Sequence, residues 1–318
     1  MTDTGEQQRL TIGFVGLGNM GWPMARNLHA AGFALIVRDP ATENRFAAEH
    51  EHQGVTVAKA PAAFAAADIV VTMLPNGTVV HDALLGDDGG IGPALQPGAL
   101  VLEMSSSDPS DTLRLAAELE PFAVNVVDAP VSGGVSRAVT GELAIMVGGA
   151  PGDVARAQHV LRVLGDPASQ FVTGGLGSGH AMKALNNFVA AATHCATAEA
   201  LVAGKRFGLD TRTMIDIINA STGRSFVSGT FDTEVLTGRY GTGFALGLLA
   251  KDVHIAASVV AATDLDAPLV ALVDERWAKA LTELGPATDH TTAHQAWWGD
   301  TLQWTGNAPG APRTLHGG

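Results

Sequence analysis

Residues 10–21 read Leu10-Thr11-Ile12-Gly13-Phe14-Val15-Gly16-Leu17-Gly18-Asn19-Met20-Gly21, an apolar run followed at once by glycines spaced GxGxxG. The run predicts a buried strand, and the amphipathic pattern that continues to about Ala31 predicts a helix. The first glycine would allow a tight turn, the second a close approach to a pyrophosphate, and the third packing of helix on strand. The helix N-terminus would offer N–H groups to the phosphates. We therefore expect a dinucleotide turn formed by Gly16, Leu17, Gly18, Asn19, Met20 and Gly21.

A second predicted strand, residues 34–37, leads to Asp39, which lies 18 residues after Gly21. A carboxylate at this distance would accept hydrogen bonds from the adenosine ribose and would repel a 2′-phosphate, which favours NAD. Arg38 and Arg45 leave NADP possible, because either could reach a phosphate. Both also have a plainer interpretation as surface charge.

Alternating strands and helices continue to about residue 173. Strands are predicted at 68–74, 100–104 and 124–128, each followed by a short polar or glycine-rich loop, and the last ones at 143–148 and 170–172. Loops at the carboxyl ends of parallel strands line the ligand crevice of an open sheet. We expect a dinucleotide-binding domain over 1–173, ending at Gly174-Gly175.

The second half lacks strand patterns. Helical spacing covers 183–205, 211–220, 248–263 and 268–284, with Asp210, Asp266 and Asp289 placed as N-caps. The sequence thus predicts an α/β Rossmann-type doubly wound sheet followed by an all-α C-terminal domain over 174–318. The sequence between the helices reads as loop and could line a small pocket, although packing or surface roles explain its residues equally well. These are Arg224, Phe226, Phe231 and Tyr240.

The stretch Gly177–Asn187 opens a nearly uncharged predicted helix. His180, Lys183 and Asn187 recur at helical spacing on one face. Most lysines are solvated, but one set among Ala, Met and Leu is a candidate for proton transfer. Lys251 is a second lysine in an apolar helical context, either a solvated end or a group directed at the cofactor.

Ser132-Gly133-Gly134 follows a predicted strand. Consecutive residues without side chains expose backbone N–H groups, which suits a substrate carboxylate. A flexible loop is the simpler alternative.

Composition narrows the function classes. The 318 residues carry a net charge of −13 and 46% hydrophobic residues, with a single cysteine, Cys195. The acidic balance argues against nucleic-acid or anionic-membrane partners, and the lone cysteine suits a reducing cytoplasm. The polar lead Met1–Arg9 and the tail after Gly306 are predicted to be loose. Trp297, Trp298 and Trp304 are interpreted as packing or oligomer contacts. No metal-ligand spacing appears beyond the pair His290 and His294.

Taken together, the motifs resemble those of the β-hydroxyacid dehydrogenase family from about Leu10 to Trp298. Two positions depart from the commoner pattern, with Glu103 where Asp is usual and Ser106 where Thr is usual. The matching segments are Gly16–Met24, Thr72–Pro75, Asp128–Gly134, Gly177–Asn187, Thr222–Arg224 and Ala250–Asp252.

The resemblance implies reversible NAD(P)-dependent hydride transfer between a 3-hydroxy acid, such as 3-hydroxyisobutyrate, and its semialdehyde, in a homodimer or homotetramer. Lys183 would be the general acid/base, Asn187 its partner, and Lys251 a cofactor-side lysine. Alternatives are tartronate semialdehyde, succinic semialdehyde or a sulfonated aldehyde as substrate, or a non-catalytic dinucleotide-binding scaffold. Substrate contacts would be Ser132, Gly133, Gly134, Lys183, Asn187 and Phe231, and further cofactor contacts Arg38, Asp39, Leu74, Pro75 and Ser106.

Overall fold

The computed structural model describes residues 10–50, 54–87, 89–299 and 302. The expectations for Met1–Arg9, Trp304 and the tail after Gly306 fall outside these ranges. The chain divides into two compact units, the first formed by residues 1–186 with 261–263 and the second by 187–260 with 264–318. Each unit is described by itself.

The first unit is built on one sheet whose strand order is β3-β2-β1-β4-β5-β6-β8-β7, with β9 paired to β8. The pairs from β3 through β6 are all parallel, while β8 runs antiparallel to β6 and β7. The order reverses direction after β1, which creates the crevice where doubly wound sheets bind ligands. The strands are β1 Thr11–Val15, β2 Ala34–Arg38, β3 Val55–Val57, β4 Ile69–Thr72, β5 Leu100–Glu103, β6 Asn125–Asp128, β7 Val131–Ser132, β8 Leu143–Gly148 and β9 Gly165–Gly174.

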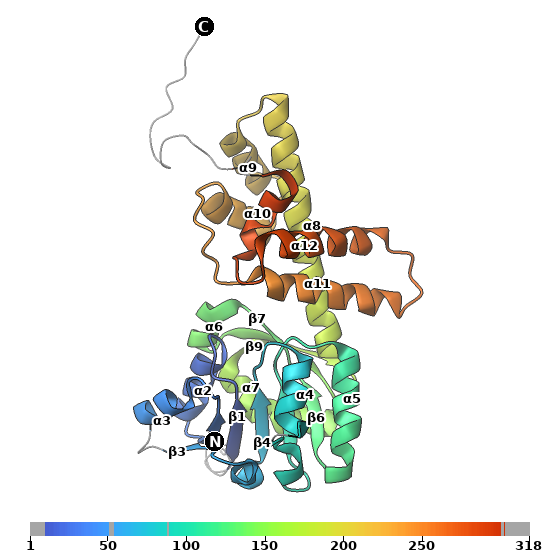
Figure 1. Cartoon of the computed structure of the whole chain (residues 1–318). Coiled ribbons are helices and arrows are strands. Elements are labelled where there is room, and N and C mark those ends of the chain that lie inside the picture. Colours follow the sequence, from blue (N-terminus) through green and yellow to red (C-terminus); the bar gives the residue numbers. More distant parts are fainter. Residues whose placement is uncertain (1–9, 51–53, 88, 300–301, 303–318) are drawn as a thin grey trace. The chain divides into compact units, whose positions relative to one another are not determined.

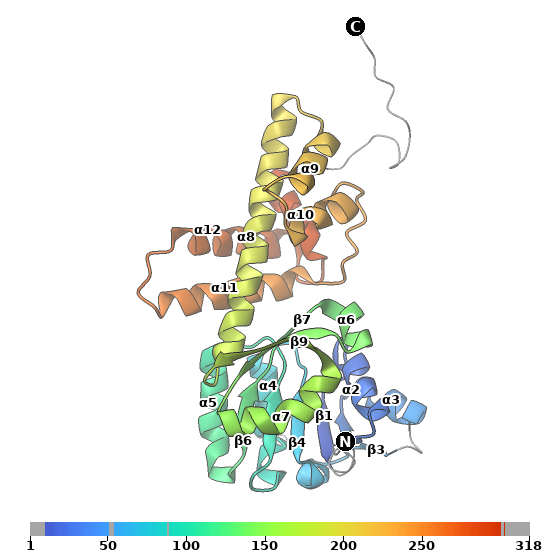
Figure 2. The same cartoon turned by 180° about the vertical axis from the view of Figure 1, so that it is seen from behind.

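Side-chain alternation along the central strands fills two cores. Val71 and Leu102 point into one apolar cluster, and Val70 and Val101 point into the other. Helices on both faces cover these clusters, as the opposite views in Figure 1 and Figure 2 show for α4 and α7. The helices of this unit are α2 Gly21–Ala30, α3 Glu43–His50, α4 Gly77–Leu85, α5 Pro109–Leu119, α6 Gly134–Thr140 and α7 Pro151–Leu164, with short 3-10 turns at Pro61–Ala66, Gly92–Ala94 and Glu120–Phe122.

The predicted Rossmann-type fold is confirmed, with two strands that the sequence did not indicate. β3 has three residues and β7 has two, too few for an alternating pattern to emerge. β9 is longer than the expected 170–172.

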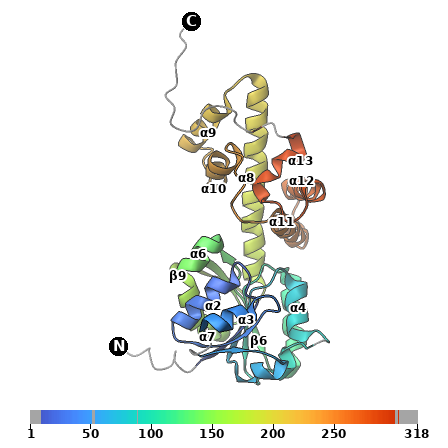
Figure 3. The same ribbon diagram turned by 60° about the vertical axis from the view of Figure 1, so that its left-hand side comes forward.

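The second unit is helical. Its two apolar clusters include α8 residues, one packed with α11, α12 and α13 around Trp277 and the other with α9 and the turn at Phe231. Figure 3 shows α9 and α10 on one side of α8 and α11–α13 on the other. None of the described helices is long and apolar enough to cross a membrane. The helices are α8 Ser178–Phe207, whose residues up to 186 belong to the first unit, α9 Thr211–Ala220, α10 Phe226–Thr230, α11 Leu246–Ala261, α12 Pro268–Leu284 and α13 His294–Trp298, with a π-turn (η4) at Phe231–Val235 and a 3-10 turn (η5) at His290–Thr292.

Two of the three expected helix caps are confirmed. Asp210 accepts a hydrogen bond from Thr213 N, and Asp289 caps η5. The cap predicted at Asp266 is wrong, since Ala267 is the N-cap of α12 and makes no side-chain hydrogen bond. Pro268 stands in the first turn of α12, where its missing N–H leaves one donor fewer to be capped. The loop expected around Phe226 and Phe231 is also wrong, because both residues lie in short helical turns.

Candidate active site

The glycine turn after β1 has the geometry that its spacing predicts. Gly16 has φ +98°, and a Cβ there would lie 2.3 Å from Met73 O. A Cβ on Gly21 would lie 1.9 Å from Gly16 O, whereas nothing lies within 4 Å of the corresponding position on Gly18. The first and third glycines therefore permit backbone packing, and the second faces open space. Because α2 begins at Gly21 and its N-cap, Met20, makes no side-chain hydrogen bond, this turn fits a dinucleotide pyrophosphate.

Asp39 is tied to the same turn. Its Oδ2 accepts a hydrogen bond from Leu17 N at 2.7 Å, and its Oδ1 accepts from the N–H groups of Ala41 and Thr42. Burial raises the pKa of the Asp39 carboxyl, but these hydrogen bonds outweigh burial and lower the pKa below its ordinary value. An ionised carboxylate is therefore held beside the glycine turn.

The two arginines beside Asp39 are both engaged. Arg38 donates to Gly89 O at 2.8 Å. Arg45 stacks over Trp22, with 4.3 Å from its guanidinium carbon to the ring centroid, and pairs with Glu49. These contacts support the interpretation of the arginines as structural or surface charge.

The ends of β4 and β5 are joined by a serine that the sequence did not single out. Leu74 N donates to Ser105 Oγ at 2.9 Å, so the loops that carry Leu74, Pro75 and Ser106 are neighbours. Pro75 is exposed and Ser106 half-buried. The hydroxyl at Ser105 resembles any other in a Ser-Ser-Ser run, and only the strand register reveals its role.

The Ser132-Gly133-Gly134 loop joins β7 to α6. Gly133 has φ +129° and Gly134 has φ +66°, both exposed. A Cβ on Gly133 would lie 2.6 Å from Arg137 Cδ. The loop therefore depends on glycine and presents bare backbone to solvent.

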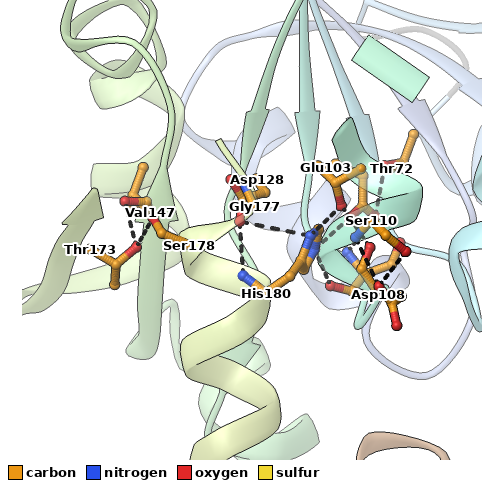
Figure 4. A network of polar contacts seen from close by, with 12 residues as sticks. Thr72, Glu103, Asp108, Ser110, Asp128, Val147, Thr173, Gly177, Ser178 and His180 are labelled. Atoms are coloured by element: carbon orange, nitrogen blue, oxygen red, sulfur yellow. Dashed lines mark hydrogen bonds and ion pairs between the residues drawn. The ribbon is translucent and has the colours of Figure 1, made fainter. Parts of the chain in front are cut away.

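Lys183 lies in the first turns of α8, and only 9% of its surface is exposed. The start of this helix is fixed by Asp128, whose two carboxylate oxygens accept hydrogen bonds from Gly177 N and His180 N, both at 2.8 Å. His180 Nε2 lies 2.5 Å from Glu103 Oε2. Figure 4 shows His180 directed at the ends of β5 and β6.

Neither Glu103 nor Asp128 was assigned a site role from the sequence. A signal was available, since each is the last residue of its strand and directly follows apolar residues. Gly179 belongs to the same contact, because a Cβ there would lie 2.4 Å from Met146 O and 2.8 Å from Asp128 Oδ2. The close approach that this glycine permits is to strands β6 and β8.

In the helical unit, Asn187 and Lys251 meet at a third residue that the sequence analysis did not assign. Asn187 Nδ2 donates to Asp252 Oδ2 at 2.6 Å, and Lys251 Nζ lies 3.0 Å from Asp252 Oδ1. Asp252 is 2% exposed. An aspartate directly after a lysine on an otherwise apolar helix was a sequence signal for a buried charge, although not for the bond to Asn187.

Phe231 is fully buried in the apolar cluster around α8 and η4, against the His194 ring. Its surroundings are those of a packing residue. A hollow of about 670 Å³ on this unit is lined instead by Asn219, Arg224, Ser225, Phe226, Gly229, Thr230 and Thr233. Among the described residues, no group of three or more His, Cys, Asp or Glu side chains could hold a metal ion.

Known proteins match both halves of the chain. Residues 11–175 match the family model described as the NAD binding domain of 6-phosphogluconate dehydrogenase. Residues 177–297 match the model described as NAD-binding of NADP-dependent 3-hydroxyisobutyrate dehydrogenase.

Individual relatives agree with these models. The mitochondrial 3-hydroxyisobutyrate dehydrogenase of Rattus norvegicus is 38% identical over 77% of this chain and 74% of its own. The 2-(hydroxymethyl)glutarate dehydrogenase of Eubacterium barkeri is 35% identical over 85% of this chain and 88% of its own. The solved structure of Mycobacterium tuberculosis 3-hydroxyisobutyrate dehydrogenase with L-serine has a TM-score of 0.80 at 33% identity, covering 91% of this chain and 99% of that one.

The site and the comparisons point to the same kind of protein. The site combines a glycine turn suited to a pyrophosphate with a buried lysine on an anchored helix, and the matches cover most of the chain. The chain belongs to the β-hydroxyacid dehydrogenase family and is an NAD(P)-dependent oxidoreductase of hydroxy acids.

Proposed function

We propose that this enzyme oxidises 3-hydroxyisobutyrate, or a close 2-substituted 3-hydroxypropanoate, reversibly to the semialdehyde, with Lys183 as general acid/base. The observation that carries the proposal is a lysine with 9% exposure on a helix whose first turn is fixed to the sheet by Asp128. Burying a lysine costs free energy, and a role in proton transfer would explain why one is retained here.

The names of the similar proteins support one substrate class. 3-Hydroxyisobutyrate, 2-(hydroxymethyl)glutarate and L-serine, named for three of them, share the unit HOCH2–CH(R)–COO⁻. The carboxylate would bind the backbone of Ser132, Gly133 and Gly134. The R group differs among the three, so selectivity would depend on the residues that face it.

The bound nicotinamide cofactor supplies the hydride acceptor, and the chain handles the proton. In the oxidising direction neutral Lys183 would take the hydroxyl proton, and in the reducing direction its ammonium would return it. Asn187 would orient the substrate, with its amide held by Asp252 at 2.6 Å. Lys251, paired with Asp252, would be the cofactor-side cation.

NAD is the proposed cofactor, because ionised Asp39 beside the glycine turn would repel a 2′-phosphate. The cofactor would contact the residues predicted above, with Leu74, Pro75 and Ser106 along the strand ends. We further propose that residues 1–173 bind the dinucleotide, that 174–318 bind substrate and form a homodimer or homotetramer, and that the enzyme acts in the cytoplasm.

The proposal predicts a large loss of turnover when Lys183 is replaced. Lys183→Ala should lower kcat about 10²–10⁴-fold, because a general acid/base contributes that range. Absorbance at 340 nm with a panel of 3-hydroxy acids, run with NAD and with NADP, measures both activity and preference.

Lys205 is the matched control, since it lies near the other end of the same helix and is exposed. Lys205→Ala should retain wild-type kcat. A folded, cofactor-binding Lys183→Ala protein with near-normal turnover would refute the assignment.

A further inference from the structure

The first turn of α8 carries a buried ionic cluster for which the hydride-transfer mechanism has no use. The side chains of His180 and Glu103 are 0% and 1% exposed, and Nε2 and Oε2 lie 2.5 Å apart. A buried charged pair is costly unless its geometry is fixed by further hydrogen bonds. The surroundings of both side chains provide them.

The hydrogen bonds around the ring define its protonation. Thr112 Oγ1 lies 3.2 Å from Asp108 O, to which it can donate, and 2.8 Å from His180 Nδ1, from which it can then accept. Nε2 faces Ser105 O at 3.1 Å as well as the Glu103 carboxylate. Neither a carbonyl nor a carboxylate can donate. Nε2 therefore carries a proton, and a second proton on Nδ1 gives an imidazolium, which the carboxylates of both Glu103 and Asp128 stabilise.

Glu103 needs this cation. Its Oε1 accepts from Ser105 N at 2.9 Å and lies 3.4 Å from Thr72 Oγ1. Its Oε2 meets no well-aligned hydrogen-bond donor among the described residues. The imidazolium, together with the network around it, balances that oxygen's charge.

The other charged group facing the ring is Asp128, whose Oδ2 lies 3.7 Å from Nδ1. Asp128 also accepts the main-chain N–H groups of Gly177 and His180. The start of α8 is therefore held through its backbone by β6 and through the His180 side chain by β5 and α5. The side-chain link prevents the helix from rotating about its axis while the backbone link stays intact.

We propose that His180 is a positioning residue for Lys183, one turn further along the helix. The His180–Glu103 pair sets the rotation of the first turn of α8 and thereby the direction of the lysine side chain. The inference rests on the proposed role of Lys183. A misplacement of about 1 Å can cost about 10²-fold in rate, so a loose first turn would show in kcat.

The test compares His180→Gln, Glu103→Gln and the double variant, each measured for kcat, for KM of the cofactor and for thermal unfolding. The single variants should lose at least about tenfold in kcat, with cofactor KM within about twofold. The double variant should be no slower than the slower single, because the two residues act as one unit. Glu103→Asp, which keeps the charge, should recover most of the kcat lost in Glu103→Gln.

The matched control is Ser178→Ala. Ser178 Oγ lies 2.7 Å from Thr173 Oγ1 at the same helix start, and the substitution leaves the ionic cluster intact. It should alter stability but not kcat. If the folded His180→Gln enzyme keeps wild-type kcat, or loses kcat only in proportion to thermal unfolding as Ser178→Ala does, the inference is wrong.

Two further outcomes separate the hypotheses. If His180→Gln does not fold, the double variant, which removes both charges together, decides by the same kcat criterion. If Lys183→Ala retains turnover, the proposed function fails regardless of His180. If Lys183→Ala is inactive and the His180 variants are unaffected, only the positioning role fails.

Discussion

Helix α8 carries two buried histidines whose pKa values are shifted in opposite directions. His180 in the first unit and His194 in the second are 1% and 2% exposed. Burial lowers the pKa of His180, but the Glu103 carboxylate beside it more than reverses this and raises the pKa above its ordinary value. Burial lowers the pKa of His194 well below its ordinary value, and neighbouring His290 and His294 lower it further.

The contrast shows that the partner, rather than burial, decides whether a buried histidine is charged. The His194 ring packs against Phe231, Trp277 and Trp297, and the described groups that shift its pKa are two other histidines and no carboxylate. His180 is a structural cation and His194 a polar member of an apolar core.

The two groups also respond to pH with opposite signs. His180, whose folded pKa is raised, contributes stability below its unfolded pKa and loses it as pH rises through the folded value. His194, whose folded pKa is lowered, contributes stability above about pH 6.5 and loses it as pH falls. Burial raises the pKa of Glu103, but the His180 charge and hydrogen bonds lower it overall, so its contribution disappears only in acid.

The largest loss of stability should come from adding a side chain at Gly179, next to the His180 contact with the sheet. Gly179→Ala would place a Cβ 2.4 Å from Met146 O and 2.8 Å from Asp128 Oδ2. Neither atom can withdraw, since Met146 O belongs to strand β8 and Asp128 Oδ2 accepts the His180 N–H. We expect a loss of about 3 kcal/mol, or roughly 6–12 °C in Tm, measured by calorimetry.

The same substitution in the helical unit provides the contrast. Gly229 lies in α10, and nothing lies within 4 Å of a Cβ added there. Gly229→Ala should be neutral or stabilise by up to about 1 kcal/mol. Equal losses in the two variants would mean that close packing at α8 is unimportant.

Sequence spacing predicted the roles of the glycine turn but not the contacts that hold the start of α8, and the reason is physical. The roles of Gly16 and Gly21 follow from a local strand–turn–helix unit and were confirmed, as were the helices at 211–220 and 268–284. The bond from His180 N to Asp128 joins residues 52 positions apart, and no local period encodes it. Asp252 was missed for the same reason, since its bond to Asn187 spans 65 positions.

A smaller effect should appear in how stability depends on pH, where His180 and His194 are expected to differ. In the wild type, protonation of His194 on unfolding should remove up to about 1.4 kcal/mol of stability per pH unit below pH 6.5. His194→Leu keeps a similar volume and removes the titrating group, so its stability should fall less steeply. Urea unfolding at pH 8 and pH 5.5, followed by tryptophan fluorescence, reports on this unit through Trp277, Trp297 and Trp298.

The slopes, and not the absolute stabilities, decide this prediction. His290, whose pKa burial also lowers, remains in the variant and should retain a part of the acid dependence. His254 is 74% exposed, so His254→Gln should leave the slope as in wild type. If His194→Leu and wild type lose stability in parallel, His194 does not lie neutral in the folded protein.

The smallest effect concerns Cys195, the residue after His194, where burial acts on an acid. Burial raises the pKa of the Cys195 thiol to about 12. At pH 8 only about one thiol in 10⁴ would be ionised, and the thiolate is the nucleophile. Because the chain has one cysteine, mass spectrometry after iodoacetamide treatment reads this site alone. We expect almost no labelling of the folded enzyme, complete labelling in urea, and unchanged activity during the exposure. Fast labelling of the native protein would show that the Cys195 thiol is accessible and ionises readily, and burial would then not explain the difference between this part of α8 and His180.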